Sequence, residues 1–589
     1  MRPTSVGPRG RFLGYSAPPG VEWILSQSEA TMSTPFAALA NLGEKLEGTT
    51  KRLELADSVA QFLLKLAPEE VPAGVRLIIG QVFPEWDGRA LDLSWKAVAR
   101  VVEGLTKATP AQREAIFAQA VDGGQAVQLL LERARIGPPQ GPPLSLLDVY
   151  RAFEEIAATT GRGSRARKEA LLRRLLSRAT PLEAKYIVKN VLAEMRHGVG
   201  EGIMLEAIAR AAGVKTALVR RANQLWGDLG EVAVVALAEG EAGLKRASVR
   251  LFRPLKPMLA QTAEDLAEAF ERYGGRVALE YKLDGARVQI HKRGDEVRIY
   301  SRQLSDVTGS LPEVAAEVRR GLRAEEAILE GEVIAVDTQG RPLPFQHLMR
   351  RFRRVHDVAA MAREVPVQLY LFDLLYLDGR SLVDSPEHER WQALESVAGS
   401  LRLVPRMLPR TVEEGRRFAE AAYRDGHEGV MAKDLASKYT PGVRGRSWLK
   451  LKHALSLDLV IVAADWGYGR RHGWLSNYHL AVRDEETGQY LVVGKTFKGL
   501  TDEEFEEMTA RLLALERFRR GGTVFVEPKV VVEVVFNEIQ ESAQYKSGLA
   551  LRFARIARVR DDKRPTEADT LQTLRQLYQR QFEYKGKPG

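Results

Sequence analysis

The sequence predicts a multidomain protein with an all-α N-terminal region, a central α+β domain and a small C-terminal β-barrel that ends in a helical tail. Its 589 residues correspond to about three or four domains. Apolar residues recur at helical spacing up to about residue 239, and short strands alternate with helices beyond residue 253. We place the domain limits at 32–245, 246–455 and 456–589.

Composition limits the classes of function. The chain has no cysteine, which excludes disulfides, thiolate zinc sites, iron–sulfur clusters and thiol nucleophiles. No segment approaches the roughly 20 apolar residues of a membrane span or the shorter apolar run of a signal peptide. We therefore expect a soluble, cytoplasmic protein with no membrane partner. The 87 Lys and Arg against 77 Asp and Glu give a net charge of +10, which suits a partner such as nucleic acid but also a basic surface with no specific partner.

The N-terminal half contains helices and loops. Residues 1–31 are rich in Pro, Gly and Ser and predict a disordered extension, so that Met32 is an alternative start. Residues 36–239 are almost entirely helical in pattern, and Gly198 ends one of the helices. The glycine-rich link 196–202 then offers backbone N–H groups for phosphate contacts, with an ordinary interhelical turn as the alternative.

The central domain contains a distinctive strand at residues 277–283. Its residues alternate, so that Glu280 and Lys282 share one face. Asp284 and Gly285 turn the chain directly afterwards, which leaves Lys282 at the strand end where a ligand can reach it. An ordinary exposed lysine is the alternative, and Lys-x-Asp-Gly-x-Arg by itself is only suggestive.

Further motifs follow this strand in a defined order. They are Ser301-Arg302, Leu329-Glu330-Gly331-Glu332, Leu371-Phe372-Asp373, Glu428-Gly429-Val430-Met431-Ala432-Lys433, Trp448-Leu449-Lys450-Leu451-Lys452 and Arg560-Asp561-Asp562-Lys563. The set resembles the covalent nucleotidyltransferase superfamily, in particular the ATP-dependent DNA ligases of archaeal and eukaryotic replicative type. The resemblance covers nearly all of the chain beyond Met32. It implies a helical DNA-binding domain, an adenylation (nucleotidyltransferase) domain and an OB-fold barrel.

The resemblance assigns the nucleophile to Lys282. In this family the lysine attacks the α-phosphate of ATP, expels pyrophosphate and carries AMP as a phosphoramidate. Attack requires a neutral amine, whereas the ordinary pKa of lysine is about 10.4. Lys450, Lys452 and a bound divalent metal are the cations that we expect to lower the pKa of Lys282. A simple polar strand face is the alternative interpretation of the two downstream lysines.

The same resemblance assigns the other nucleotide-binding residues. Glu280 matches the residue that reads the adenine amino group, and Phe372 matches the aromatic that stacks on adenine, with a core position as its alternative. The ribose and the phosphates are assigned to Arg287, Arg302, Glu332 and Arg444. After Arg302 the chain reads Gln303-Leu304-Ser305 where relatives commonly have Asn-x-Glu, which leaves the fine ribose contacts open.

Metal binding and domain closure complete the implied site. Glu332 and Glu428 match the carboxylates that bind Mg²⁺ or Mn²⁺, and the alternative for Glu428 is a surface pair with Lys433. Arg560 and Lys563 match barrel residues that contact the β- and γ-phosphates when the barrel closes over ATP. The basic run 350–356 either lines the DNA path or is solvated.

The implied function is ATP-dependent sealing of nicks in duplex DNA. The enzyme forms lysyl–AMP, transfers AMP to the 5′-phosphate, and joins the strands when the 3′-hydroxyl displaces AMP. An RNA ligase or mRNA-capping nucleotidyltransferase is the alternative, which the helical domain of about 200 residues disfavours. We expect a monomer, with a sliding clamp as a candidate partner. The nucleotide range (ADP, GTP or NAD), the replication or repair role and the heat tolerance stay open.

Overall fold

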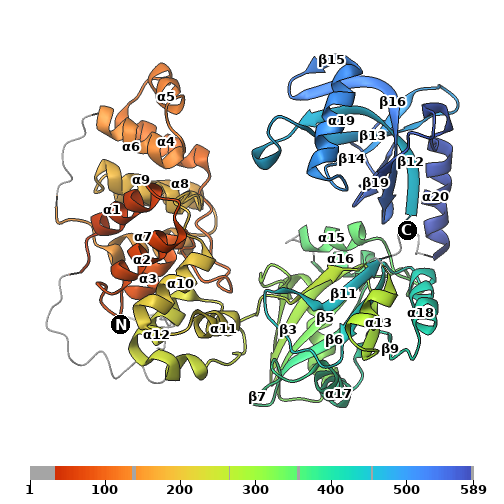
Figure 1. The fold of residues 1–589 in the computed structure, drawn as a ribbon. Helices are drawn as coiled ribbons and strands as arrows, with labels where there is room; N and C mark the ends of the chain where they lie inside the picture. Colours follow the sequence, from red (N-terminus) through yellow and green to blue (C-terminus); the bar gives the residue numbers. More distant parts are fainter. Residues whose placement is uncertain (1–32, 135–140, 264, 354–357, 453–454, 585–589) are drawn as a thin grey trace, which may run out of the picture. The chain divides into compact units, whose positions relative to one another are not determined.

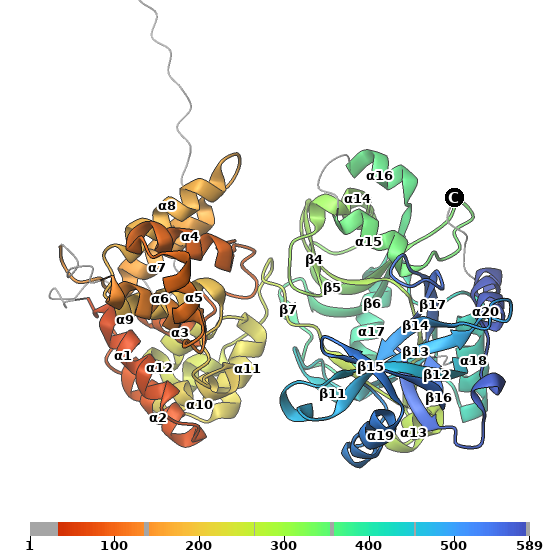
Figure 2. The same ribbon diagram turned by 90° about the horizontal axis from the view of Figure 1, so that it is seen from above.

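The computed structural model describes residues 33–134, 141–263, 265–353, 358–452 and 455–584 (Figures 1 and 2). The predicted disordered extension, residues 1–31, lies outside this part. The chain divides near residue 247 into two compact units, with residues 224–227 belonging to the second. All of the motifs named above from Lys282 onward lie in the second unit. None of the described helices is long and apolar enough to cross a membrane.

The described part of the first unit is helical, as the sequence predicts, but the helix expected to end at Gly198 ends at Leu192, with Ala193 as its left-handed C-cap. Its helices are α1 (Phe36–Glu47), α2 (Arg52–Leu63), α3 (Val71–Ile79), α4 (Trp95–Thr106), α5 (Pro110–Phe117), α6 (Gly123–Arg133), α7 (Leu146–Ala158), α8 (Ser164–Leu176), α9 (Pro181–Leu192), α10 (Glu201–Ala212), α11 (Thr216–Trp226) and α12 (Leu229–Lys245). The start of α9 shows how the local sequence sets these boundaries. The Thr180 hydroxyl accepts a hydrogen bond from the Glu183 N–H, the Glu183 carboxylate accepts one from the Thr180 N–H, and Pro181 occupies the first turn.

The second unit begins with two sheets. The first sheet has the order β1 (Leu259–Thr262), β11 (Arg444–Lys452), β10 (Gly429–Asp434), β2 (Val277–Lys282), β9 (Arg406–Met407). The second has the order β4 (Glu296–Ser301), β3 (Ala286–Arg293), β5 (Glu326–Ala335), β6 (Val367–Leu377), β7 (Arg380–Ser381), with β8 (Arg402–Leu403) beside β6. Helices α15 (Phe345–Arg353) and α16 (Val358–Glu364) lie between β5 and β6 in the chain.

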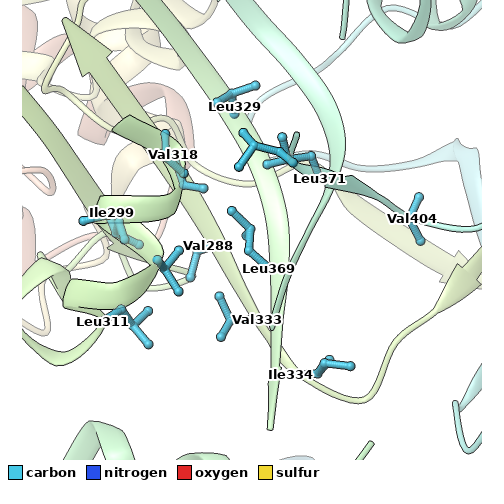
Figure 3. Close-up of a cluster of buried hydrophobic side chains, with 14 of the residues drawn as sticks. Val288, Ile299, Leu311, Val318, Leu329, Val333, Ile334, Leu369, Leu371 and Val404 are labelled. Carbon is cyan, nitrogen blue, oxygen red and sulfur yellow. The ribbon is translucent and has the colours of Figure 1, made fainter. Parts of the chain in front are cut away.

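Each sheet has its own hydrophobic core on one face. Helices α13 (Leu266–Arg272) and α18 (Val412–Arg424) pack on the first sheet (Figure 1). Helix α14 (Pro312–Gly321) lies beside β4 and α17 (Glu387–Val397) beside β6 (Figure 2). Figure 3 shows the core of the second sheet, in which strand residues such as Val288, Leu329 and Leu371 meet Leu311 and Val318. The polar faces of the two sheets are thereby left for other contacts.

The last part of the chain is a strongly bent antiparallel sheet, as predicted for the barrel. Its order is β14 (Tyr490–Thr496), β13 (Leu475–Arg483), β12 (Leu455–Trp466), β16 (Thr523–Phe536), β15 (Glu516–Arg520), with β19 (Arg555–Val559) also paired to β16. The remaining elements are the pair β17 (Glu538–Glu541) and β18 (Leu549–Arg552), helix α19 (Asp502–Ala514) and the tail helix α20 (Leu571–Tyr584). The fold class predicted from the sequence is therefore confirmed.

Candidate active site

Lys282 is the last residue of β2, and the turn that follows carries the chain from the first sheet to the second. Gly285 permits this turn because a Cβ atom there would lie only 2.3 Å from the carbonyl oxygen of Val333. Real Cβ atoms do not approach backbone so closely, so no other residue fits without movement of β5. The turn brings Lys282 of the first sheet within electrostatic range of Glu332 of the second sheet, and Glu332 is the cross-strand neighbour of Arg287 between β5 and β3.

Three carboxylates surround the Lys282 amine. The Lys282 Nζ lies 2.6 Å from the Glu428 carboxylate, and the Glu428 N–H also donates to the Lys282 carbonyl oxygen at 3.0 Å. Glu332 and Asp284 act on the same amine electrostatically, and Asp284 is almost fully buried. The end of β2 is therefore an acidic site with one lysine inside it.

This environment shifts both ionisable partners. Burial raises the pKa of Glu332 to about 7, against the opposing effects of Lys282 and Arg287. Burial alone would lower the pKa of Lys282, but Glu428, Glu332 and Asp284 outweigh it and hold the pKa above its ordinary value. This direction is opposite to the one expected from Lys450, Lys452 and a bound divalent metal, because the three carboxylates dominate around the amine; the effect of a bound metal stays a prediction.

The register of the first sheet places the downstream lysines relative to Lys282. Lys282 pairs with Gly429, which pairs with Lys452 on the other side. Glu280 and Lys450 are related in the same way through Met431. Neighbouring strands lie about 4.8 Å apart, so the backbones of Lys452 and Lys282 are about 10 Å apart. The strand that ends at Lys282 and the strand that carries Lys450 and Lys452 thus lie in one sheet, with β10 between them.

Glu280 is buried and paired to two cations. Its Oε2 lies 2.6 Å from Lys433 Nζ, and its Oε1 accepts a hydrogen bond of 2.6 Å from Arg406, which also binds Glu387. Lys433 is itself almost fully buried. The alternative of a surface pair between Glu428 and Lys433 is therefore wrong, because Lys433 pairs with Glu280 instead.

Phe372 lies on β6, half-buried, with two cations near its ring. Lys433 Nζ lies 5.0 Å and the Arg287 guanidinium 5.3 Å from the ring centroid. The Trp448 ring meets it edge-on at 6.3 Å, and Lys433 also donates to the Phe372 carbonyl oxygen at 3.0 Å. Phe372 also packs against the core of the second sheet. The alternative of a core position therefore holds in part, and stacking on adenine stays a prediction.

The remaining predicted arginines differ in exposure. Arg302 follows β4 in a turn, is exposed, and has no polar partner among the described residues. Arg444 begins β11, is exposed, and donates to the Ala260 carbonyl oxygen at 2.9 Å. Arg287 is bound most firmly: it pairs with Glu330 and donates to the Met258 carbonyl oxygen at 2.6 Å.

Arg560 and Lys563 lie in the barrel and pair with acidic residues of the barrel. Both pair with Asp458 on β12, Arg560 at 3.0 Å, and Arg560 also binds Asp562 at 2.7 Å. The contacts of the described residues therefore gather the last motif around Asp458 rather than around Lys282.

The acidic residues suit a hard divalent cation. No group of three or more His, Cys, Asp or Glu side chains in ligating arrangement occurs in the described part of the chain. Mg²⁺ is ordinarily bound by one or two carboxylates, with water and substrate phosphates completing the octahedron. The pair Glu332 and Glu428 fits this pattern, which does not require a closed cage of protein ligands.

Arg351 is the one residue of the basic run 350–356 whose side chain is described, and it is buried. It pairs with Glu313 at 2.6 Å and donates to the carbonyl oxygens of Ser310 and Val365. These contacts hold α15 to neighbouring segments, so Arg351 itself is not solvated. The other side chains of the run lie outside the described part, and a place along the DNA path stays a prediction for them.

The glycine-rich link 196–202 is held by buried groups. Lys189 donates to the Met195 carbonyl oxygen at 3.1 Å, and the buried His197 ring accepts a hydrogen bond from the Val199 N–H at 3.3 Å. A Cβ at Gly200 would meet no atom within 4 Å, so packing inside the protein does not require glycine there. The link is therefore a firmly held turn with free space outside it.

Sequence reasoning missed several residues of the site. They are Lys433, Arg406, Trp448 and the pair Tyr439 and Glu330, which binds Arg287. Lys433, Glu330 and Trp448 lie within the motifs of the sequence analysis, but the motifs alone gave these three residues no role. No local sequence pattern marks Arg406 or Tyr439.

Comparison with known proteins covers most of the chain. Family models described as ATP dependent DNA ligase domain, DNA ligase N terminus, and ATP dependent DNA ligase C terminal region match residues 257–452, 35–209 and 471–563. DNA ligase 1 of Korarchaeum cryptofilum is 47% identical over 547 residues, 92% of this chain and 98% of the relative. The DNA ligase of Thermococcus onnurineus is 42% identical over 556 residues, 94% of this chain and 99% of the relative.

Solved structures support the fold. The structure named Pmar-Lig_Pre aligns with 89% of this chain and 99% of its own, with a TM-score of 0.52 and 17% identity. At that identity the likeness concerns the arrangement of the backbone alone.

Proposed function

Because the chain belongs to the ATP-dependent DNA ligase family, we propose that Lys282 is the residue that carries AMP. The enzyme seals nicks in duplex DNA with ATP as the AMP donor and a divalent metal such as Mg²⁺. In the first step the lysine amine attacks the α-phosphorus, the bond to pyrophosphate breaks, and the amine loses its proton. AMP then passes to the 5′-phosphate of the nick, and the 3′-hydroxyl displaces it to form the phosphodiester.

One observation carries the assignment to Lys282. Its amine stands at the end of β2, 2.6 Å from Glu428 and within electrostatic range of Glu332 of the second sheet, on which Arg287 acts as well. Lysine inside a carboxylate cluster with an arginine beside it offers a nucleophile, metal-binding oxygens and a phosphate or ribose donor together. The exposed surface lysine considered above lacks this arrangement.

Glu332 and Glu428 are the proposed metal ligands. The cation would neutralise negative charge on the transferring phosphates and on the leaving pyrophosphate. Within the chain, Glu428 orients the Lys282 amine through the ion pair and through its N–H bond to the Lys282 carbonyl oxygen. The ion pair fixes the direction of the amine, and the backbone hydrogen bond fixes the end of the strand that carries it, before substrate binds.

The nucleotide contacts follow from the two polar sheet faces. We propose that Glu280 and Phe372 read the adenine, the latter by stacking. The sugar and phosphates would be bound by Arg287, Arg302, Glu332, Arg444, Lys450 and Lys452, and by Arg560 and Lys563 from the barrel. The pairing of Arg560 and Lys563 with Asp458 supports a joint role for these two cations.

The architecture supports a division of labour among domains. We propose a DNA-binding domain at 32–245, an adenylation domain at 246–455 and an OB-fold domain at 456–589, with the link 196–202 contacting phosphates. A monomeric enzyme in the cytoplasm or on the nucleoid, and a sliding clamp as partner, are further parts of this proposal. Size-exclusion chromatography with and without a clamp protein tests the last two statements about assembly.

A labelling experiment tests the proposed function. The protein is incubated with α-labelled ATP and Mg²⁺, resolved by denaturing electrophoresis, and then supplied with nicked duplex DNA, with RNA ends, or with a capping acceptor. We expect labelled protein that loses its label to nicked DNA and yields sealed strands. Transfer only to RNA, or labelling only by GTP, would favour the RNA ligase or capping alternative.

A further inference from the structure

A continuous chain of buried polar groups ends at Arg287. It begins at Phe252, whose N–H donates to His291 Nδ1 at 2.8 Å, and His291 Nε2 in turn contacts Gln289 Oε1 at 2.9 Å. Because Nδ1 accepts, the proton is on Nε2. Gln289 Oε1 also accepts from the Leu255 N–H at 2.8 Å.

Glu330 is the centre of this chain. It is almost fully buried and accepts hydrogen bonds from Gln289 at 3.3 Å and from the Tyr439 hydroxyl at 2.8 Å, and it pairs with Arg287. The buried Tyr439 hydroxyl accepts from the Met258 N–H at 3.0 Å and from Arg287 Nη2 at 3.3 Å. Burial raises the pKa of Tyr439, so the hydroxyl keeps the proton that it donates to Glu330.

The contacts determine where the Arg287 guanidinium lies. Its Nη1 donates to the Met258 carbonyl oxygen at 2.6 Å, and its Nη2 binds both Glu330 and Tyr439. Its flat group lies 5.3 Å from the Phe372 ring centroid and 5.5 Å from that of Trp448. Arg287 Nε is buried and has no partner among the described residues, so one donor stays available.

We propose that Tyr439 is a positioning residue for AMP transfer, which it serves by holding Arg287 and Glu330 in the orientation that binds the nucleotide. Tyr439 does not touch the substrate. Its hydroxyl joins three segments far apart in the chain, at Met258, Arg287 and Glu330, and without it the guanidinium keeps its charge but loses a fixed direction. The inference rests on the proposed function, in which Arg287 contacts bound nucleotide.

The test is Tyr439→Phe, which removes one oxygen and keeps the ring. A matched control is Tyr273→Phe in the same domain: Tyr273 is also buried, and its hydroxyl donates a hydrogen bond of 2.7 Å to the Arg446 carbonyl oxygen rather than contacting Arg287 or Glu330. We expect the single-turnover rate of protein labelling at saturating ATP to fall about tenfold for Tyr439→Phe. The control should stay within about twofold of wild type, with similar thermal midpoints for both variants.

A double-mutant cycle separates positioning from general stability. In an Arg287→Ala background, Tyr439→Phe should change the labelling rate by less than about twofold, because the group through which it acts is gone. Glu330→Gln should behave in the same way and serves if Tyr439→Phe does not fold. A rate unchanged in folded Tyr439→Phe, or an equal loss with and without Arg287, would overturn the proposal. A wild-type protein that ATP does not label would instead overturn the proposed function and this inference with it.

Discussion

The Lys282 ammonium lies 2.6 Å from the Glu428 carboxylate, at the end of the strand that carries both Glu280 and Lys282. Lys282 is therefore protonated and ion-paired in the absence of substrate, since Glu428, Glu332 and Asp284 hold its pKa above the ordinary value. Attack on ATP requires the amine to lose this proton. The ion pair is thus both an orienting contact and a barrier that substrate and metal binding have to relieve.

Replacement of Lys282 separates the first step from the last. Lys282→Ala should abolish labelling by ATP and the sealing of an ordinary nick, because it removes the proposed nucleophile. It should still seal a nick that already carries 5′-AMP, a step that needs no lysine nucleophile. The control is Lys438→Ala, an exposed lysine 3.7 Å from Asp384. Normal labelling of Lys282→Ala would refute the assignment.

Glu428→Gln tests the paired carboxylate. It keeps the shape but removes the charge that binds Lys282 and the proposed metal. We expect the Mg²⁺ concentration for half-maximal labelling to rise and the rate to fall by at least about tenfold. Asp425→Asn is the control, since Asp425 is near in sequence and accepts from Tyr281. The metal assignment fails if the Mg²⁺ requirement of Glu428→Gln equals that of wild type.

Deletion of residues 1–247 removes the helical unit. Labelling by ATP should be largely retained, because every nucleotide-facing residue lies beyond it. Nick sealing should fall steeply, and further as salt is raised from low to moderate concentration, since fewer phosphate contacts remain and they are screened. Sealing rates at several salt concentrations check this. Equal sealing by both proteins at moderate salt would show that the helical unit does not bind DNA.

Arg560 and Lys563 should matter for the first step alone. Both pair with Asp458, and their cations would stabilise departing pyrophosphate, which is absent from the closure step. Lys563→Ala or Arg560→Ala should therefore slow lysyl–AMP formation far more than sealing of a nick with 5′-AMP. Arg558→Ala provides a control, because Arg558 pairs with Glu533 on the barrel. Equal losses in both single-turnover rates would point to a folding role.

His291 makes stability depend on pH. Burial lowers its pKa to about 3 in the folded protein, against about 6.5 when unfolded. Between these two pKa values the unfolded chain binds a proton at His291 and the folded chain does not. The free energy of unfolding therefore falls as the pH falls from about 6.5 towards 3. Between pH 7 and pH 5 the loss is about 2 kcal/mol.

His291→Gln should remove this dependence, because an amide does not titrate in that range. Calorimetry of wild type and variant at pH 7 and pH 5 measures the difference. The wild-type transition should move down further than that of the variant over this interval. Parallel shifts would show that His291 is not the responsible group.

Local sequence determined much of this protein. The alternation of residues 277–283 placed Glu280 and Lys282 on one face, because a strand has a period of two. The Asp284-Gly285 turn and the motifs can also be seen in the sequence, so the family, the three-part architecture and the proposal that Lys282 is the nucleophile followed from the sequence. The start of α9 is set locally as well, because Thr180 and Glu183 are residue types that cap a helix N-terminus.

Only the tertiary structure decided which charges meet. Glu280 is 153 positions from Lys433 and 126 from Arg406 in the sequence, yet it binds both, because β2 lies between β10 and β9. Tyr439 reaches Glu330 in the same way, across 109 positions. Sheet order and register determine such pairs, and the spacing of residues along one segment predicts neither the order nor the register. The pKa of Lys282 followed the carboxylates that this packing assembled, rather than the lysines that its motif suggested.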